Sequence, residues 1–478
     1  MSQKYYTTIG LEIHAELKTK SKMFCHCINN PDEKNPNTNI CPVCTAQPGT
    51  LPVINKKAVE NVIKVGLALN GQISNFTEFD RKNYFYPDIP KAYQISQYKF
   101  PIVSGGELNG VKITRIHLEE DTATSKHNNE ENLSLQGGYS LVDFNRGGVP
   151  LMELVTEPVI HSSKEAGDFG RELQTLLRYL DVSDANMEKG QMRVELNISV
   201  SDDPSKFGTK VEVKNINSFR AMERAAEYEI KRMTELLDNK EGDKIVQETR
   251  GWDENKGVTF SQRSKENAND YRYFPDPDLP KLYLSEVFDI NKLRSELPEL
   301  PKERRERYRS NYGIKNEDIE SYILDKELGD WFEKVGDILK NKDKIKIASN
   351  YITSDYLGLK KNNEGIKLPS TDNFIELIEM ISENKISSRV AKDILAMIVV
   401  LDNSPMKIAE EKGLIQKNDE GELREIITKI LESNITVVNT YKEGKENALM
   451  SLVGQVMKET KGSANPQLVQ KLLKELIK

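Results

Sequence analysis

Hydrophobic and polar residues alternate strictly near the amino terminus, a pattern that predicts a β-strand. In IGLEIHAELKT, residues 9–19, every second position is apolar, and Glu12, His14 and Glu16 fall on the opposite face. Residues 192–200 (MRVELNISV) and 209–219 (TKVEVKNINSF) alternate in the same way and predict a β-hairpin with one charged face. Such a face can form the floor of a substrate site, or it can simply face solvent.

The pattern changes at about Asn291, where helical periodicity with Lys and Glu faces replaces strand alternation. Three amphipathic helices are predicted at the end of the chain, in residues 421–434, 445–462 and 465–478. Gly462 suits the residue after a helix, and Asn465 followed by Pro466 is typical of a helix start.

These patterns predict an α+β protein of several domains. A chain of 478 residues exceeds the roughly 250 to 300 residues that one hydrophobic core supports. We expect a mixed α/β domain with a largely antiparallel sheet in residues 1–291, an all-α helical domain in 292–404 and a small α-helical tail domain in 405–478.

Charge and hydropathy narrow the functional classes. A net charge of −7 argues against a uniformly basic nucleic-acid coat, yet residues 441–478 carry seven Lys against four Glu. Lys471, Lys474 and Lys478 share one helix stripe, which would contact RNA or face solvent. There is no secretory signal, and the longest apolar run, residues 394–401, is too short to cross a membrane, so we expect a cytoplasmic, soluble protein.

All four cysteines lie within residues 25–44, as a C-x-C pair and a C-x-x-C pair joined by a polar loop. Two closely spaced pairs predict a structural Zn²⁺ site, although the first pair is tighter than usual. Disulfides would be disfavoured in a reducing compartment, and a catalytic thiol would more often be a lone cysteine. The predicted zinc ligands are Cys25, Cys27, Cys41 and Cys44.

Two carboxylates interrupt apolar runs. In TRIHLEEDTA, residues 114–123, Glu120 continues the face of Ile116 and Leu118, and in GVPLMELVTEP, residues 148–158, Glu153 stands among apolar residues. A buried carboxylate either takes up a proton or finds a cation. Each glutamate alone would more often be an ordinary surface group, but jointly they predict a Mg²⁺ or Mn²⁺ site. Its predicted ligands are Glu12, His14, Glu120 and Glu153.

Residues 79–97 (FDRKNYFYPDIPKAYQISQ) mix basic, amide and aromatic side chains, a combination suited to holding phosphates and stacking on planar groups. Residues 270–280 (DYRYFPDPDLP) repeat the theme, and both stretches could instead be aromatic loops anchored to the core. The candidates here are Arg81, Asn83 and Tyr84 for a nucleotide cofactor, with Lys82 and Lys91 for the reacting groups.

Common catalytic motifs are missing from the sequence. There is no glycine-rich phosphate loop, no G-x-G-x-x-G after a strand and no serine nucleophile elbow. Because no glutaminase or amidase machinery is present, the chain would need a partner to make ammonia.

Taken together, these segments resemble the GatB family, the B subunits of the tRNA-dependent amidotransferase complex GatCAB. The resemblance runs nearly end to end, through residues 10–19, 79–97, 117–123, 142–158, 207–219, 270–278 and 453–469. It implies a kinase and transamidase: ATP phosphorylates the side-chain carboxylate of Glu-tRNA(Gln) or Asp-tRNA(Asn), and ammonia then displaces the phosphate.

The resemblance also implies partners and site roles. Ammonia would come from an amidase, the A subunit of the complex, and a small C subunit would clasp both larger subunits. The family's cradle domain, with its divalent-ion ligands, matches residues 1–291 and the four ligands given above, and its zinc knuckle matches the four cysteines. Lys82 and Lys91 would meet phosphate or line the ammonia path, and the tail would bind tRNA. The alternatives are a non-catalytic, zinc-stabilised tRNA-binding scaffold and a metal-dependent hydrolase of small molecules.

Overall fold

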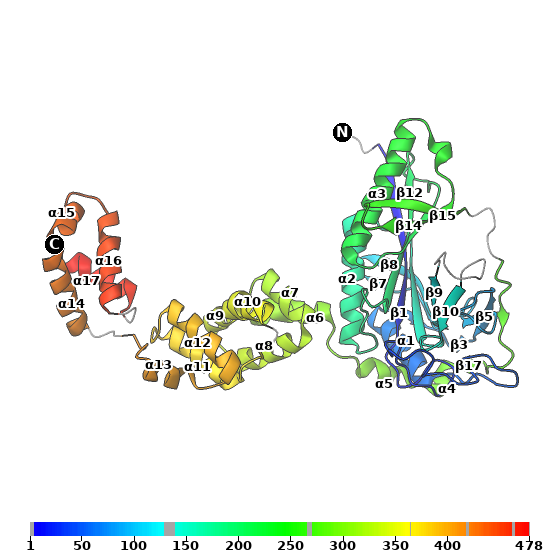
Figure 1. The fold of residues 1–478 in the computed structure, drawn as a ribbon, viewed down its shortest axis with the longest axis horizontal. Coiled ribbons are helices and arrows are strands. Elements are labelled where there is room, and N and C mark those ends of the chain that lie inside the picture. The colour runs from blue at the N-terminus through cyan, green and yellow to red at the C-terminus, as the bar shows by residue number, and fades with distance from the viewer. Residues whose placement is uncertain are drawn as a thin grey trace. The chain divides into compact units, whose positions relative to one another are not determined.

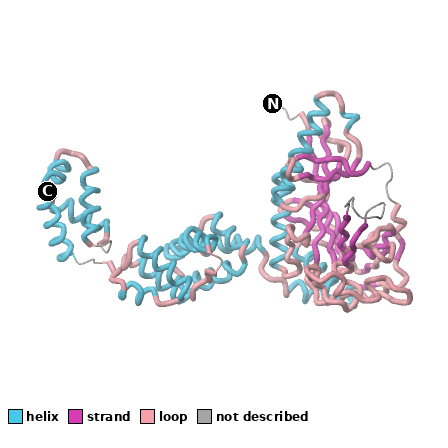
Figure 2. The backbone as a smooth tube through the Cα atoms, in the orientation of Figure 1, coloured by secondary structure: helices cyan, strands magenta, loops and turns pink. Residues whose placement is uncertain are grey.

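The structure is a computed structural model, and it describes residues 4–128, 139–264, 270–363, 365–416, 420–460 and 464–477. The chain divides into two compact units, residues 1–301 and 302–478. The first is a mixed α/β body and the second is built of helices, which confirms the predicted α+β class (Figures 1 and 2).

A ten-stranded sheet forms the centre of the first unit. Among the described pairs of this sheet, only β13 and β14 run parallel, so the prediction of a largely antiparallel sheet is confirmed. In spatial order its strands are β15 (Val258–Ser264), β14 (Glu248–Asp253), β13 (Val211–Lys214), β12 (Met192–Ser201), β1 (Tyr6–Glu16), β11 (Pro150–Thr156), β8 (Val111–Glu120), β6 (Val103–Ser104) and β2 (Gln72–Ile73), with β7 (Glu107–Leu108) paired to β8. The predicted hairpin is the β12–β13 pair, in which Leu196 lies opposite Val213.

Helices cover one face of this sheet. α1 (Lys56–Ala68), α2 (Ser163–Tyr179) and α3 (Phe219–Asp238) bury apolar faces in the same core as β1, and Figure 1 shows α2 and α3 along one side of the sheet. Each helix begins at a side-chain cap, Asn55, Ser162 or Ser218, which typically stabilises a helix by about 1 kcal/mol. The other face of the sheet is therefore left for polar side chains.

Three small sheets and short helices complete the first unit. The sheets join segments far apart in sequence: β9 (Thr124–Asn128) pairs with β10 (Tyr139–Asp143), β16 (Phe274–Pro275) with β4 (Asp80–Asn83) and through it β5 (Tyr93–Ser96), and β17 (Leu282–Tyr283) with β3 (Phe76–Thr77). The short helices are η1 (Gly242–Lys244), α4 (Leu284–Val287) and α5 (Ile290–Ser295).

The second unit consists of two groups of helices. The first group comprises α6 (Pro301–Asn311), α7 (Asn316–Leu324), α8 (Lys326–Leu339), α9 (Lys342–Asn350), the π-helical η2 (Tyr351–Tyr356), α10 (Leu357–Asn362), α11 (Thr371–Ser382), α12 (Ser388–Leu401) and α13 (Pro405–Glu411). The second comprises α14 (Glu420–Ser433), α15 (Ile435–Lys442), α16 (Asn447–Glu459) and α17 (Pro466–Leu476), which share a separate core. None of the helices within the described residues combines the length and the apolar character needed to cross a membrane.

Two features of the structure lie close to the predicted domain boundaries. The division between the units falls after Pro301, ten residues beyond the predicted end of the first domain. α13, which follows the predicted boundary at residue 405, packs against α11 and α12, and the helices that share the tail core begin at α14. Asn465 caps α17 as predicted, accepting from the backbone N–H of Gln467 and Leu468, whereas Gly462 lies outside the described residues.

Candidate active site

The polar face of the central sheet brings together side chains from β1, β11 and β8. On β1, Ile9, Leu11 and Ile13 are at most 1% exposed and pack toward the helices, so His14 points to the opposite face. In the ladder His14 lies opposite Glu153, and Glu153 lies opposite His117 on β8. Residues directly opposite in an antiparallel ladder share a face, so these three side chains meet.

Two imidazoles and two carboxylates form the resulting central cluster, which consists of His14, His117, Glu119 and Glu153. One carboxylate oxygen of Glu153, Oε2, lies 3.4 Å from His14 Nε2 and 3.2 Å from His117 Nε2. Glu119 Oε1 lies 3.6 Å from His14 Nε2, and Glu119 Oε2 lies 3.9 Å from His117 Nε2. His117, Glu119 and Glu153 are each at most 5% exposed, which sets this charged cluster deep in the sheet face.

Electrostatics within the cluster oppose the effect of burial. Burial alone would lower the pKa of His117, but the charge of Glu153 raises that pKa to about 9. Burial alone would raise the pKa of Glu153, but the charge of His117 and hydrogen bonds from both histidines hold it well below its usual range. The pKa of His14 is also raised, because the hydrogen bond and charge of Glu153 outweigh the effect of burial. Such opposed, coupled groups are typical of functional sites.

Lys82 on β4 joins the cluster electrostatically. Burial would lower the pKa of Lys82, but the negative charges of Glu119 and Glu153 raise it above its usual value. Its Nζ lies 5.2 Å from the centroid of the Tyr271 ring. The positive charge of Lys82 therefore interacts with the two buried carboxylates.

The other candidates of this segment have internal partners. Arg81, which precedes Lys82 on β4, has its Nε 3.0 Å from Asp276 Oδ2, and its guanidinium stacks 4.3 Å from the centroid of the Tyr93 ring. Asn83 Nδ2 donates to the backbone oxygens of Tyr271 and Arg272, at 3.1 and 2.9 Å. Arg81 and Asn83 thus fasten residues 271–276 to β4, while Tyr84 is half-buried and its pKa is raised by burial.

The structure brings Glu12, His14 and Glu153 of the predicted ligand set together but places Glu120 apart from them. Successive strand residues point to opposite faces, and Glu119 takes the position on the polar face. Glu120 points the other way, where its Oε1 accepts from the backbone N–H of Ile95 at 2.9 Å and lies 2.5 Å from Lys91 Nζ.

Lys91 and Glu120 line a separate cavity of about 310 Å³. Tyr93, Cys25 and Cys44 contribute to the same lining. The two predicted lysines therefore lie at different sites, Lys82 at the central cluster and Lys91 in the lining of this cavity.

A second acidic group adjoins the cluster. Glu12 lies opposite Glu195 on β12, and oxygens of Glu12, Glu195 and Glu212 lie within 4.8 Å of one another. Lys214 Nζ offsets part of this charge, 2.9 Å from Glu195 Oε2. Burial, followed by the charges of Glu153 and Glu195, raises the pKa of Glu12 to about 7. Glu12 also has an oxygen within 4.8 Å of ligand atoms of His14 and Glu153.

His117 and Glu119 belong to the central cluster but not to the predicted ligand set. The signal was present in the alternation of residues 114–123, because placing Ile116, Leu118 and Glu120 on one face puts His117 and Glu119 on the other. The ligand types on that second face would have identified both residues.

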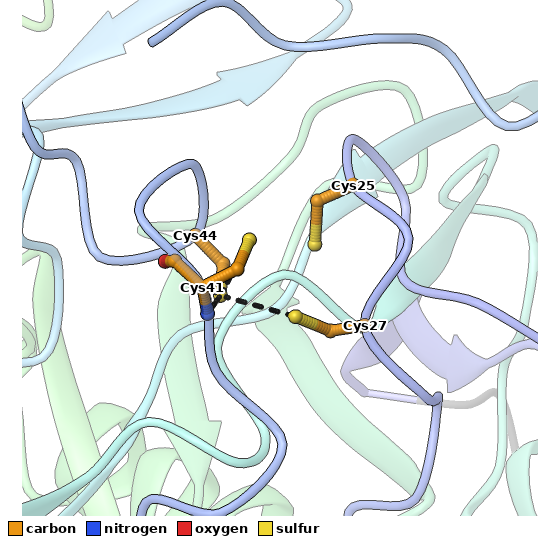
Figure 3. A group of neighbouring side chains, drawn as sticks. All are labelled: Cys25, Cys27, Cys41 and Cys44. Carbon is orange, nitrogen blue, oxygen red and sulfur yellow. Dashed lines mark hydrogen bonds between the residues drawn. The ribbon is translucent and has the colours of Figure 1, made fainter.

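The four cysteines converge as predicted (Figure 3). Cys25 and Cys27 lie on one loop and Cys41 and Cys44 on another, with all four sulfurs within 4.8 Å of one another and no disulfide among them. Cys44 Sγ lies 3.9 Å from Cys41 Sγ and 4.0 Å from Cys27 Sγ. Zn–S bonds of about 2.3 Å in a tetrahedron require sulfur separations of about 3.8 Å, so the cluster fits one zinc ion.

The cysteines also differ in acidity. A hydrogen bond from Cys25 lowers the pKa of Cys44 to about 5, while burial raises the pKa of Cys27 to about 12. The neighbouring His26 is exposed and outside the cluster. All four proposed ligands are therefore thiols.

On the tail helix α17, Lys471 and Lys474 are exposed, while Val469, Leu472 and Leu473 are buried in the tail core. Lys478 lies outside the described residues. Lys471 and Lys474 of the predicted stripe thus both face away from the tail core.

The chain is similar to known proteins over nearly its whole length. Residues 7–288 match the family model described as the GatB/GatE catalytic domain, and residues 330–477 match the GatB domain. The chain is 47% identical over 484 residues to the B subunit of the aspartyl/glutamyl-tRNA(Asn/Gln) amidotransferase of Caldanaerobacter subterraneus subsp. tengcongensis, covering 99% of both chains. The proteins of the same name from Persephonella marina and Brevibacillus brevis are 44% and 45% identical, over 99% of this chain and 100% and 99% of theirs.

Proposed function

The chain belongs to the family of aspartyl/glutamyl-tRNA(Asn/Gln) amidotransferase B subunits, and we propose that it activates and amidates glutamate or aspartate attached to tRNA. In this reaction ATP phosphorylates the side-chain carboxylate of Glu-tRNA(Gln) or Asp-tRNA(Asn), and ammonia displaces the phosphate to give the amide. A carboxylate is a poor electrophile until one of its oxygens has become a phosphate leaving group.

The observation that carries this proposal is the central cluster, with Lys82 beside it. We assign Glu12, His14 and Glu153, with Glu119 adjoining, as the residues that would hold Mg²⁺ or Mn²⁺. A bound divalent ion would offset the negative charge that develops on phosphate oxygens during transfer.

The chain's own side chains position the reacting groups. His117 fixes the Glu153 carboxylate, with its Nε2 3.2 Å from Oε2, and the buried sheet holds both rigidly. The Lys82 ammonium supplies a positive charge for a phosphate oxygen, a role that favours a compact point charge. Arg81 and Asn83 act indirectly, by holding the 271–276 segment whose Tyr271 packs beside Lys82. Tyr84 remains the candidate to contact the nucleotide.

Ammonia would reach the site from outside this chain, because its sequence carries no glutaminase machinery. We propose that an amidase A subunit supplies it and that a small C subunit joins the complex. The cavity lined by Lys91 and Glu120 is our candidate for part of the ammonia route. Because aminoacyl-tRNAs are the substrates, we propose that the complex works in the cytoplasm.

The cysteine cluster would hold a structural Zn²⁺ ion. Four thiolates leave no coordination position for a reactant, so such a site would order the loop of residues 25–44 without taking part in chemistry.

Purification of the complete complex tests the proposed function directly. The chain, co-expressed with the A and C subunits of its own cell, should convert Glu-tRNA(Gln), Asp-tRNA(Asn) or both when ATP and glutamine are supplied, as measured by analysis of the released amino acid. Failure on both tRNAs would overturn the proposal. A non-catalytic scaffold would need no buried cluster of two histidines and two glutamates, so the enzyme is favoured.

The tail lysines yield a separate prediction. Replacing Lys471 and Lys474 by Gln should weaken tRNA binding about tenfold at moderate salt and reduce its salt dependence, because two phosphate contacts are lost. The rate at saturating tRNA should stay unchanged. Binding is measured by fluorescence anisotropy with labelled tRNA.

Lys429, exposed on α14, provides a control for the tail experiment. The Lys429→Gln variant changes charge on the same small domain and should bind tRNA as tightly as the parent protein. Equal binding by the Lys471 and Lys474 double variant would contradict the assignment of this stripe.

A further inference from the structure

Lys22 is a buried lysine next to the cysteine cluster. Its side chain is 0% exposed. The Nζ atom donates to the backbone oxygen of Phe144 at 2.9 Å and lies 3.9 Å from Cys44 Sγ. Within the described residues, no carboxylate forms an ion pair with this ammonium. A buried ammonium is costly without a negative partner, and the Cys44 sulfur is the group in position to provide one.

The backbone around Lys22 fixes the side chain in this place. Its N–H donates to the oxygen of Cys27 at 2.9 Å, and its own oxygen accepts from Asn55 Nδ2 at 3.2 Å. Gly148 has a φ of +84°, and a Cβ there would lie 3.5 Å from Lys22 Cδ and 3.8 Å from Cys44 Cβ. The aliphatic stem of Lys22 thus packs against Gly148, and its tip reaches the sulfur of Cys44.

Charge balance explains why a cation belongs here. Four thiolates around one Zn²⁺ carry a net charge of −2, and groups just outside the ligands tune the stability of such sites. We propose that Lys22 is a positioning residue of the zinc site, whose ammonium stabilises the Cys44 thiolate toward the metal. This inference rests on the zinc site proposed above.

The same ammonium links the zinc site to the strand that carries Glu153. Phe144, its second partner, belongs to the segment that leads into β11. Buried Asn145 in that segment accepts from the N–H groups of Thr38 and Asn39, both at 2.9 Å, and donates to the oxygen of Asn35 at 2.8 Å. Residues 144–145 are therefore held from two sides. The Lys22 ammonium binds Phe144, and the loop between the two cysteine pairs binds Asn145.

Zinc release from the full-length chain tests the inference. Lys22→Met keeps the aliphatic stem and removes the charge. It should release zinc to 4-(2-pyridylazo)resorcinol at least tenfold faster than the parent chain, because loss of a group that supports metal ligands typically lowers metal affinity by roughly 10- to 100-fold. Lys20→Met, at an exposed lysine two residues earlier, should release zinc at the parental rate. Unchanged release by Lys22→Met would overturn the role of Lys22.

Cobalt substitution separates charge from packing. In the Co²⁺ form of Lys22→Met, loss of the nearby cation should move the thiolate-to-metal charge-transfer band to longer wavelength. Lys22→Arg keeps a positive charge and should retain the parental band. It should also bind zinc more tightly than Lys22→Met does. A parental band in Lys22→Met, or equally weak zinc binding by both variants, would overturn the inference. Should Lys22→Met fail to fold, loss of zinc by a folded Lys22→Arg variant would likewise count against the inference.

If the parent chain itself bound no zinc, the proposed zinc site would be wrong, and the role of Lys22 with it. The amidation assay would still test the proposed function independently.

Discussion

Replacing Glu153 by Gln should lower tRNA-dependent ATP hydrolysis by at least about 100-fold while leaving tRNA binding intact. Glu153 Oε2 is shared by His14 and His117, and the side chain of Glu153 is 7% exposed, so its negative charge is central to the cluster. Loss of one preorganised charged group at a transition state typically costs about 10² to 10³ in rate. Phosphate release with mischarged tRNA measures the rate, and filter binding measures the affinity for tRNA.

Glu227 offers a matched control for this prediction. It lies exposed on α3, the helix that covers the opposite side of the sheet, where it accepts from Ser163 Oγ at 3.1 Å. Glu227→Gln should hydrolyse ATP at the parental rate. Parental turnover in a folded Glu153→Gln variant would remove the central cluster from the mechanism.

Two adjacent glutamates should behave differently, because they point to opposite faces of the sheet. Glu119→Gln should lose ATP hydrolysis at least about 100-fold, since Glu119 faces His14 and His117. Removal of the buried Lys91–Glu120 pair should instead leave two reactions largely intact, namely ATP hydrolysis and amidation with added ammonium. The same change should slow amidation that uses glutamine as the ammonia source. Both reactions are followed by the amide formed on tRNA in the complete complex.

The variant that removes the Lys91–Glu120 pair must change both residues, because a lone buried charge is strongly destabilising. Lys91→Met combined with Glu120→Gln removes both charges and so avoids that penalty, and a thermal unfolding curve verifies that the chain remains folded. If Glu119→Gln stayed active while the double variant lost ATP hydrolysis, the assignment of the two faces would be reversed.

Local patterns predicted the features that depend on neighbouring residues. The alternation of β1 correctly placed Glu12 and His14 on a polar face, and the spacing of the cysteines correctly predicted that they converge. Asn465 before Pro466 correctly marked the start of α17. These features follow from strand period, short spacings and capping, which act over a few residues.

Features that depend on distant contacts were not predictable in the same way. α15 is rich in β-branched residues, which are poor helix formers, and its Val437, Val438 and Tyr441 pack onto the tail core. The pairing of Phe274 with Arg81 joins segments nearly 200 residues apart and places Tyr271 over Lys82. Likewise, the pairing of β8 with β11 brings His117 opposite Glu153, whereas the strand period alone separates Glu119 from Glu120.

The two imidazoles that share one oxygen of Glu153 have a consequence for how the site is loaded. Glu153 raises the pKa of both histidines, to about 9 for His117, so it favours the protonated form of each as long as no other cation lies between them. Entry of a divalent ion would then be an exchange, in which a protonated His14 would give up its proton to the surrounding water before its nitrogen could bind the metal. Acidification should therefore empty this centre well before it unfolds the sheet that carries it.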